Sequence, residues 1–124
     1  MASPGPKPLL LVEDEPDIRE SLRDLLADAG YPVLTAANGH EALECLRTSA
    51  ERPALILLDL MMPTMGGSTF LERLKEEPDD VAAIPVVVLS AAKDSATRHP
   101  ATVGRIEKPI DLDELLECVK RYCG

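Results

Sequence analysis

Acidic residues come directly after two strongly apolar stretches of this 124-residue chain. Glu13 and Asp14 follow LLLV, and Asp59 follows LILL. A carboxylate is costly to bury among apolar residues unless a cation or several hydrogen-bond donors lie nearby. Three carboxylates with few nitrogen or thiolate ligands suit a hard cation, Mg²⁺ rather than Zn²⁺. The acids therefore predict a magnesium site.

Two further polar residues follow apolar stretches, Ser90 after PVVVL and Lys108 after VGRIE. Beside Mg²⁺, a carboxylate can attack a phosphoryl donor and form an acyl phosphate while the lysine and the metal neutralise the oxygens. A serine hydroxyl can donate to another phosphoryl oxygen. Taken singly, each residue also has a structural interpretation as a helix cap or a surface group. Their coincidence after several apolar stretches favours phosphoryl chemistry.

The apolar stretches themselves predict the strands that position these residues. Three stretches are apolar at every position, which suits strands of a parallel sheet that is covered on both faces. Strands are predicted at 9–12, 55–58 and 85–89, with weaker ones at 32–36 and 103–107. Because functional groups gather at the carboxyl ends of parallel strands, we expect the polar residues to converge at one edge of the sheet.

Helical patterns alternate with these strands. An apolar periodicity from Ile18 to Ala29 predicts one helix, Asn38 and Glu41 form a capping box before a second, and Asp111 starts the last. A further helix follows the glycines at 66 and 67, 76–80 is interpreted as a solvated loop, and 91–102 has room for a short or irregular fourth helix. The predicted fold is α/β, a doubly wound five-stranded parallel sheet with helices on both faces.

Composition excludes several classes of protein. The net charge of −9 and the scattered Lys and Arg residues disfavour direct nucleic-acid binding. The apolar stretches are too short for membrane insertion, and residues 1–6 are interpreted as a flexible N-terminal lead-in. The three cysteines lack metal-ligand spacing and are expected to be reduced, which indicates a cytoplasmic location.

Four ordered motifs resemble the receiver (CheY-like) domain of bacterial two-component response regulators. They are VEDE at 12–15, LLDLMMPTMGG at 57–67, VLSAA at 88–92 and EKP at 107–109. Each motif is weak alone, but their order and the spacing from Asp14 to Asp59 and on to Ser90 are similar to the family. The resemblance implies a receiver domain over residues 7–122, strand order 2-1-3-4-5, and no output domain in the chain.

The resemblance also implies a role for each residue of the phosphoryl site. Asp59 is implied to be the phosphoacceptor, which receives a phosphoryl group from the phosphohistidine of a sensor histidine kinase. Ser90 is implied to bind the phosphoryl group, and Lys108 to pair with one of its oxygens, with a Lys108–Pro109 bond that is typically cis. Such a domain is a signalling switch rather than an enzyme, limited to self-catalysed phosphotransfer and slow autodephosphorylation.

The implied cofactor is Mg²⁺. Asp14 and Asp59 are implied to hold it, together with Glu13 and the backbone carbonyl of Met61. The implied partners are a histidine kinase or phosphotransfer protein and a downstream protein that the sequence does not identify. The domain is expected to be a monomer or a weak dimer.

Two departures from the family pattern lie near the end of the chain. Arg105 occupies a position, three residues before Lys108, where the family usually carries Tyr or Phe. The distance from Ser90 to Lys108 along the chain is also shorter than is usual. Both departures fall where receivers commonly contact partners, so they predict a non-standard readout of the phosphorylated state.

The same residues allow two alternatives to a phosphoacceptor switch. A pseudo-receiver would keep the fold as an interaction module without phosphotransfer. The complete set of acids, serine and lysine argues against it, whereas Arg105 and the shortened segment keep it open. An aspartyl-phosphate hydrolase of the haloacid dehalogenase type requires a second Asp two residues after the nucleophile. Met61 occupies that position, which disfavours the hydrolase.

Overall fold

Five parallel strands form a single sheet. The computed structural model describes residues 5–59, 67–90 and 102–124, without the side chains of residues 67, 68 and 90. The strands are β1 (Leu9–Val12), β2 (Val33–Ala36), β3 (Leu55–Asp59), β4 (Val86–Ser90) and β5 (Thr102–Glu107). Their order in the sheet is β2-β1-β3-β4-β5, which confirms the predicted topology.

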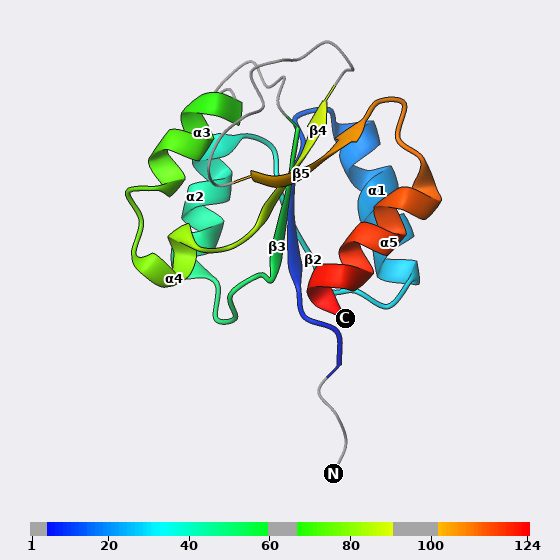
Figure 1. Ribbon diagram of the computed structural model, residues 1–124, viewed down its shortest axis with the longest axis horizontal. Helices are drawn as coiled ribbons and strands as arrows, with labels where there is room; N and C mark the ends of the chain where they lie inside the picture. The colour runs from blue at the N-terminus through cyan, green and yellow to red at the C-terminus, as the bar shows by residue number, and fades with distance from the viewer. Residues whose placement is uncertain (1–4, 60–66, 91–101) are drawn as a thin grey trace.

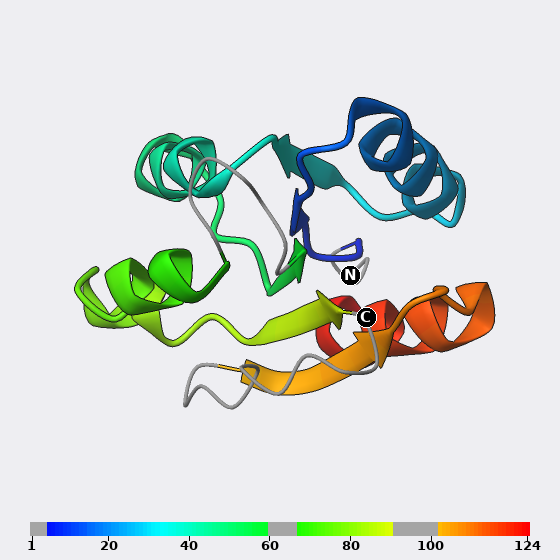
Figure 2. The ribbon, with the colours of Figure 1, turned by 90° about the horizontal axis from the view of Figure 1, so that it is seen from above.

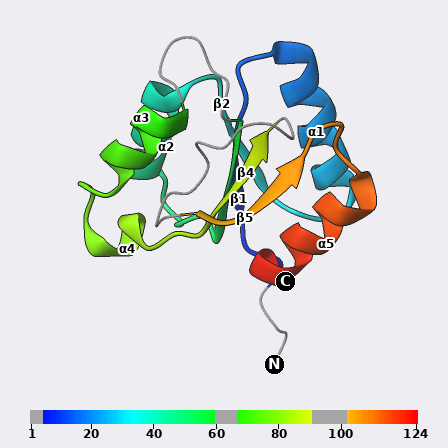
Figure 3. The same cartoon turned by 45° about the horizontal axis from the view of Figure 1, so that its top comes forward.

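Helices cover both faces of this sheet (Figures 1, 2 and 3). The helices among the described residues are α1 (Pro16–Asp28), α2 (Gly39–Thr48), α3 (Gly67–Leu74), α4 (Asp79–Ala82) and α5 (Leu112–Cys123). One face of the sheet packs against α1 and α5, and the other packs against α2, α3 and α4. In the part of the chain that the structure describes, no helix is long and apolar enough to cross a membrane.

The unbroken apolar stretches are buried on both faces, as predicted. In β1, Leu10 and Val12 point into the core beneath α2 and α3, whereas Leu9 and Leu11 point into the core beneath α1 and α5. All four side chains are fully buried. Because β1 lies between the parallel strands β2 and β3, the residues that follow it lie beside the carboxyl ends of both neighbours.

Side-chain caps start two of the helices where the sequence predicted them. The Glu41 N–H donates to Asn38 Oδ1 over 2.9 Å, and the Glu41 carboxylate accepts from the Ala37 N–H over 3.1 Å. Asp111 Oδ1 accepts from two N–H groups in the first turn of α5, those of Asp113 and Glu114. These bonds satisfy donors that have no partner within the helix.

The segment between α3 and β4 differs from the prediction. Residues 76–80 were expected to be a solvated loop, but α4 begins there at Asp79. Pro78 precedes the helix and two acids occupy its first turn, which favours a helix start. Val81 anchors the turn because it is buried in the core beneath α2 and α3.

The predicted short helix at 91–102 lies outside the described residues, except that Thr102 already belongs to β5.

Candidate functional site

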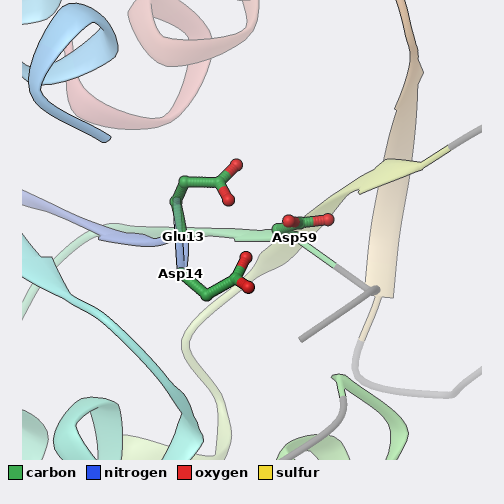
Figure 4. A group of neighbouring side chains, drawn as sticks. All are labelled: Glu13, Asp14 and Asp59. Atoms are coloured by element: carbon green, nitrogen blue, oxygen red, sulfur yellow. The ribbon is translucent and has the colours of Figure 1, made fainter. Parts of the chain in front are cut away.

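Three carboxylates meet at the carboxyl edge of the sheet (Figure 4). Glu13 and Asp14 follow β1, and Asp59 is the last residue of the neighbouring strand β3. Each offers an oxygen within 4.8 Å of the oxygens of the other two. Glu13 is only 2% exposed and Asp59 only 3%, while Asp14 is half-buried. The cluster therefore opens to solvent on the side of Asp14.

A lysine from the far edge of the sheet pairs with this cluster. Lys108 follows β5, and its Nζ lies 3.1 Å from Asp59 Oδ1. The Lys108–Pro109 peptide bond is cis. The ammonium supplies the cation that a buried carboxylate needs, and the bond between them is charge-assisted.

The surroundings of Glu13 disfavour the ionised form of its carboxyl group. Burial chiefly, and the neighbouring Asp59 in addition, raise the pKa of its carboxyl from 4.5 to about 7, against the opposing effect of the hydrogen bond from the Glu15 N–H. Charge repulsion and loss of hydration both disfavour the ionised form. A divalent cation among these oxygens would offset both effects, and carboxylate oxygens are among the ligands that Mg²⁺ prefers.

Hydrogen bonds to the N–H, the carboxylate and the carbonyl oxygen of Glu13 hold the loop that carries the first two acids. Its N–H donates to the Ala36 carbonyl of β2 over 3.0 Å, and its Oε2 accepts from the Glu15 N–H over 3.1 Å. Its carbonyl oxygen accepts from Arg19 Nη1 over 3.0 Å. Sequence reasoning assigned no role to Arg19, although long helical side chains point back toward the helix N-terminus.

Two predicted site residues remain, Ser90 and Met61. Ser90 ends β4, where its backbone lies beside Glu107 of β5, and its side chain lies outside the description. Met61 also lies outside the described residues. The structure therefore brings together Glu13, Asp14, Asp59 and Lys108, and places the backbone of Ser90 at the same edge of the sheet.

Arg105 lies on β5 and pairs with Glu107 over 2.8 Å. A shift in the pairing of β4 with β5 skips Val103, so that Arg105 pairs with Val88 and Ile106 with Leu89. The shift turns Ile106 into the core beneath α5 and leaves Arg105 exposed. An arginine is tolerated here because this position is not in the core.

Comparison with known proteins identifies the family. The sequence model of the response regulator receiver domain matches residues 9–120. The chain belongs to the response regulator receiver domain family. Receiver domains are the phosphoacceptor signalling domains of two-component systems. They interact with histidine kinases or phosphotransfer proteins, and generally bind Mg²⁺ at an acidic pocket.

Individual relatives agree with this assignment. The receiver domain is 38% identical to the transcriptional regulatory protein CrdR of Helicobacter pylori, over 94% of this chain and 54% of that protein. It is 31% identical to sporulation initiation phosphotransferase F of Bacillus subtilis, over 92% of this chain and 91% of that protein. A crystal structure of the receiver domain of a Syntrophus aciditrophicus histidine kinase superposes with a TM-score of 0.82 at 33% identity. The match covers 94% of this chain and 89% of that structure. Relatives thus include proteins about twice as long as this chain and proteins of similar length.

Proposed function

We propose that this receiver domain is a Mg²⁺-dependent phosphoacceptor switch in which Asp59 takes a phosphoryl group from a phosphohistidine. The proposal is supported chiefly by one arrangement: the buried Asp59 carboxylate is bonded to Lys108 and lies beside the carboxylates of Glu13 and Asp14. The donor would be a sensor histidine kinase or a phosphotransfer protein. The same function favours a cytoplasmic location and a receiver domain over residues 7–122.

Mg²⁺ would be held by Asp14 and Asp59, with Glu13 as a weaker ligand and the backbone carbonyl of Met61 completing the set. When bound, the ion would neutralise the oxygens of the transferred phosphoryl group. Asp14 is the most accessible of the three carboxylates, so it is the one best placed to meet an ion that enters from solvent.

The chain's own residues would perform the transfer in one displacement. An Asp59 carboxylate oxygen attacks the phosphorus, so that a P–O bond forms as the P–N bond to the imidazole breaks. The imidazole nitrogen leaves with the electron pair of that bond. Lys108 keeps its proton and exchanges its bond to Asp59 for one to a phosphoryl oxygen. The hydroxyl of Ser90 would donate to another phosphoryl oxygen.

The phosphorylated state would then change the binding of a downstream protein. Because Arg105 replaces the usual aromatic residue, a ring that swings inward cannot carry this change. The readout would therefore depend on other contacts of β5 and α5.

Phosphorylation by a small donor tests the proposal directly. The protein is incubated with acetyl phosphate and Mg²⁺, and its intact mass is measured. We expect one added phosphoryl group in the wild type, none in Asp59→Asn, and none in EDTA. Asp28→Asn is the matched control, because Asp28 is exposed at the end of α1, far along the chain from the cluster. It should be phosphorylated like the wild type.

The same experiment addresses the pseudo-receiver alternative. If neither acetyl phosphate nor a phosphorylated kinase adds a phosphoryl group that Asp59→Asn abolishes, the domain is an interaction module without phosphotransfer. A gain of mass that persists in Asp59→Asn would place the phosphoryl group on another residue and refute the assigned role of Asp59.

A further inference from the structure

Arg19 connects the first turn of α1 to the acidic loop. Its Nη1 donates to the carbonyl oxygen of Glu13 over 3.0 Å, and its backbone N–H donates to the Glu15 carbonyl over 2.9 Å. The side chain is half-buried, and the bond that it makes to Glu13 is partly shielded from solvent. One residue therefore holds both the start of the helix and the loop before it.

The position of Arg19 in the helix explains this contact. Side chains of an α-helix point toward its N-terminus, so an arginine one turn inside α1 can reach back beyond the first residue of the helix. The Glu13 carbonyl belongs to the peptide group that joins Glu13 to Asp14. A hydrogen bond to this oxygen fixes the plane of that peptide, and the plane sets the direction in which the Asp14 side chain leaves the backbone.

We infer that Arg19 is a positioning residue for the metal-binding acids, because its bond to the Glu13 carbonyl fixes the peptide from which Asp14 projects. The inference rests on the proposed function, since it assigns Arg19 a role in Mg²⁺ binding at that site. Arg19 makes no contact with the metal or the phosphoryl group in this role. It acts through the backbone of the loop.

Electrostatics alone gives the opposite expectation. Removing a positive charge from the neighbourhood of three carboxylates makes the site more negative, and this should strengthen the binding of a divalent cation. Removing a positioning bond should instead weaken binding, because partners that orient metal ligands typically contribute about tenfold or more to affinity. The direction of the change therefore separates the two roles.

Arg23 provides the matched control. It lies one turn further along α1, its side chain is about half exposed, and its ion pair is with the adjacent Asp24 over 3.2 Å. Arg23→Ala removes the same charge from the same region of the helix surface without removing the bond to Glu13. Arg19→Lys keeps the charge and an ammonium group that can donate to a carbonyl, so it is the conservative variant.

The test is titration of each protein with Mg²⁺ by calorimetry, together with the rate of phosphorylation by acetyl phosphate as a function of Mg²⁺ concentration. Circular dichroism in EDTA first confirms that each variant is folded at the temperature used. We expect the Mg²⁺ Kd to rise about tenfold in Arg19→Ala. Arg23→Ala should remain within about twofold of the wild type, and Arg19→Lys should recover much of the loss. At saturating Mg²⁺ the rate for Arg19→Ala should approach that of the wild type.

The possible failures are distinguishable. If the wild type does not bind Mg²⁺, the proposed function fails and the role of Arg19 fails with it. If the wild type binds Mg²⁺ but Arg19→Ala binds equally well or more tightly, the proposed function stands and the positioning role is wrong. An equal weakening in Arg19→Ala and Arg23→Ala would also overturn the positioning role, because of these two arginines it is Arg19 whose described side-chain bond is to the Glu13 carbonyl.

Discussion

Replacing Glu13 by glutamine removes one of three crowded carboxylates, and we expect the metal-free protein to become more stable. Glu13→Gln keeps an oxygen that can accept the Glu15 N–H, and its amide can donate to a neighbouring carboxylate. It leaves the Lys108 bond to Asp59 intact. The substitution therefore changes the charge of the cluster with little change in its shape.

The magnitude follows from two observations. Charges separated by 4.8 Å, the greatest spacing in the cluster, repel by roughly 3.5 kcal/mol at an effective dielectric constant of about 20. The pKa of Glu13, raised from 4.5 to about 7, corresponds to about 3 kcal/mol at 1.36 kcal/mol per pH unit. We expect a gain of about 3 kcal/mol at high pH, or roughly 12 °C in Tm for a domain of this size.

The gain should depend on pH in a defined direction. The raised pKa means that folded wild type holds its Glu13 proton to higher pH than the unfolded chain does. The free energy of unfolding of the wild type is therefore unaffected by this group below pH 4.5, and it falls as pH rises from 4.5 toward 7. The advantage of Glu13→Gln should grow from about 1 kcal/mol at pH 5 to about 3 kcal/mol at pH 8.

Urea unfolding followed by far-UV circular dichroism, in EDTA at pH 5 and pH 8, measures this difference. Glu20→Gln is the control, because Glu20 is an exposed carboxylate on α1 and its loss changes the net charge equally. It should change stability by no more than a few tenths of a kcal/mol. A Glu13→Gln protein no more stable than wild type at pH 8, or a gain that does not vary with pH, would refute the argument that burial and repulsion destabilise the ionised form of Glu13.

Two further predictions concern the core and the thiols. Phe70 of α3 is fully buried in the core between this helix, α2 and the sheet. Phe70→Ala should therefore destabilise the protein by about 3–5 kcal/mol in urea unfolding, and Phe70→Leu by clearly less. Equal losses would mean that the ring is not packed as described. Burial, and secondarily Cys118, raises the pKa of the Cys123 thiol to about 11, so iodoacetamide at pH 8 should modify Cys123 much more slowly in the folded protein than in urea. Peptide mass spectrometry measures both rates, and equal rates would contradict the burial of this thiol.

Much of the fold could be predicted because its signals are local. Unbroken apolar stretches predicted β1, β3 and β4, and side chains near the helix starts predicted the caps at Asn38 and Asp111. These signals act over a few residues, through the periodicity of strands and helices and through hydrogen bonds within one turn. The short helix α4 escaped prediction because Val81 is its main anchor, and the burial of one residue depends on distant elements.

By itself, the sequence determined which residue types stand at the ends of the parallel strands, and hence that carboxylates and a lysine would share one edge of the sheet. Only the tertiary structure decided that Lys108 reaches Asp59 from two strands away, that Glu13 is nearly inaccessible, and that Arg19 holds the loop. The physical reason is that ion pairing and burial depend on distances across the sheet. Those distances are set by packing between segments far apart in the chain, which no short sequence pattern encodes.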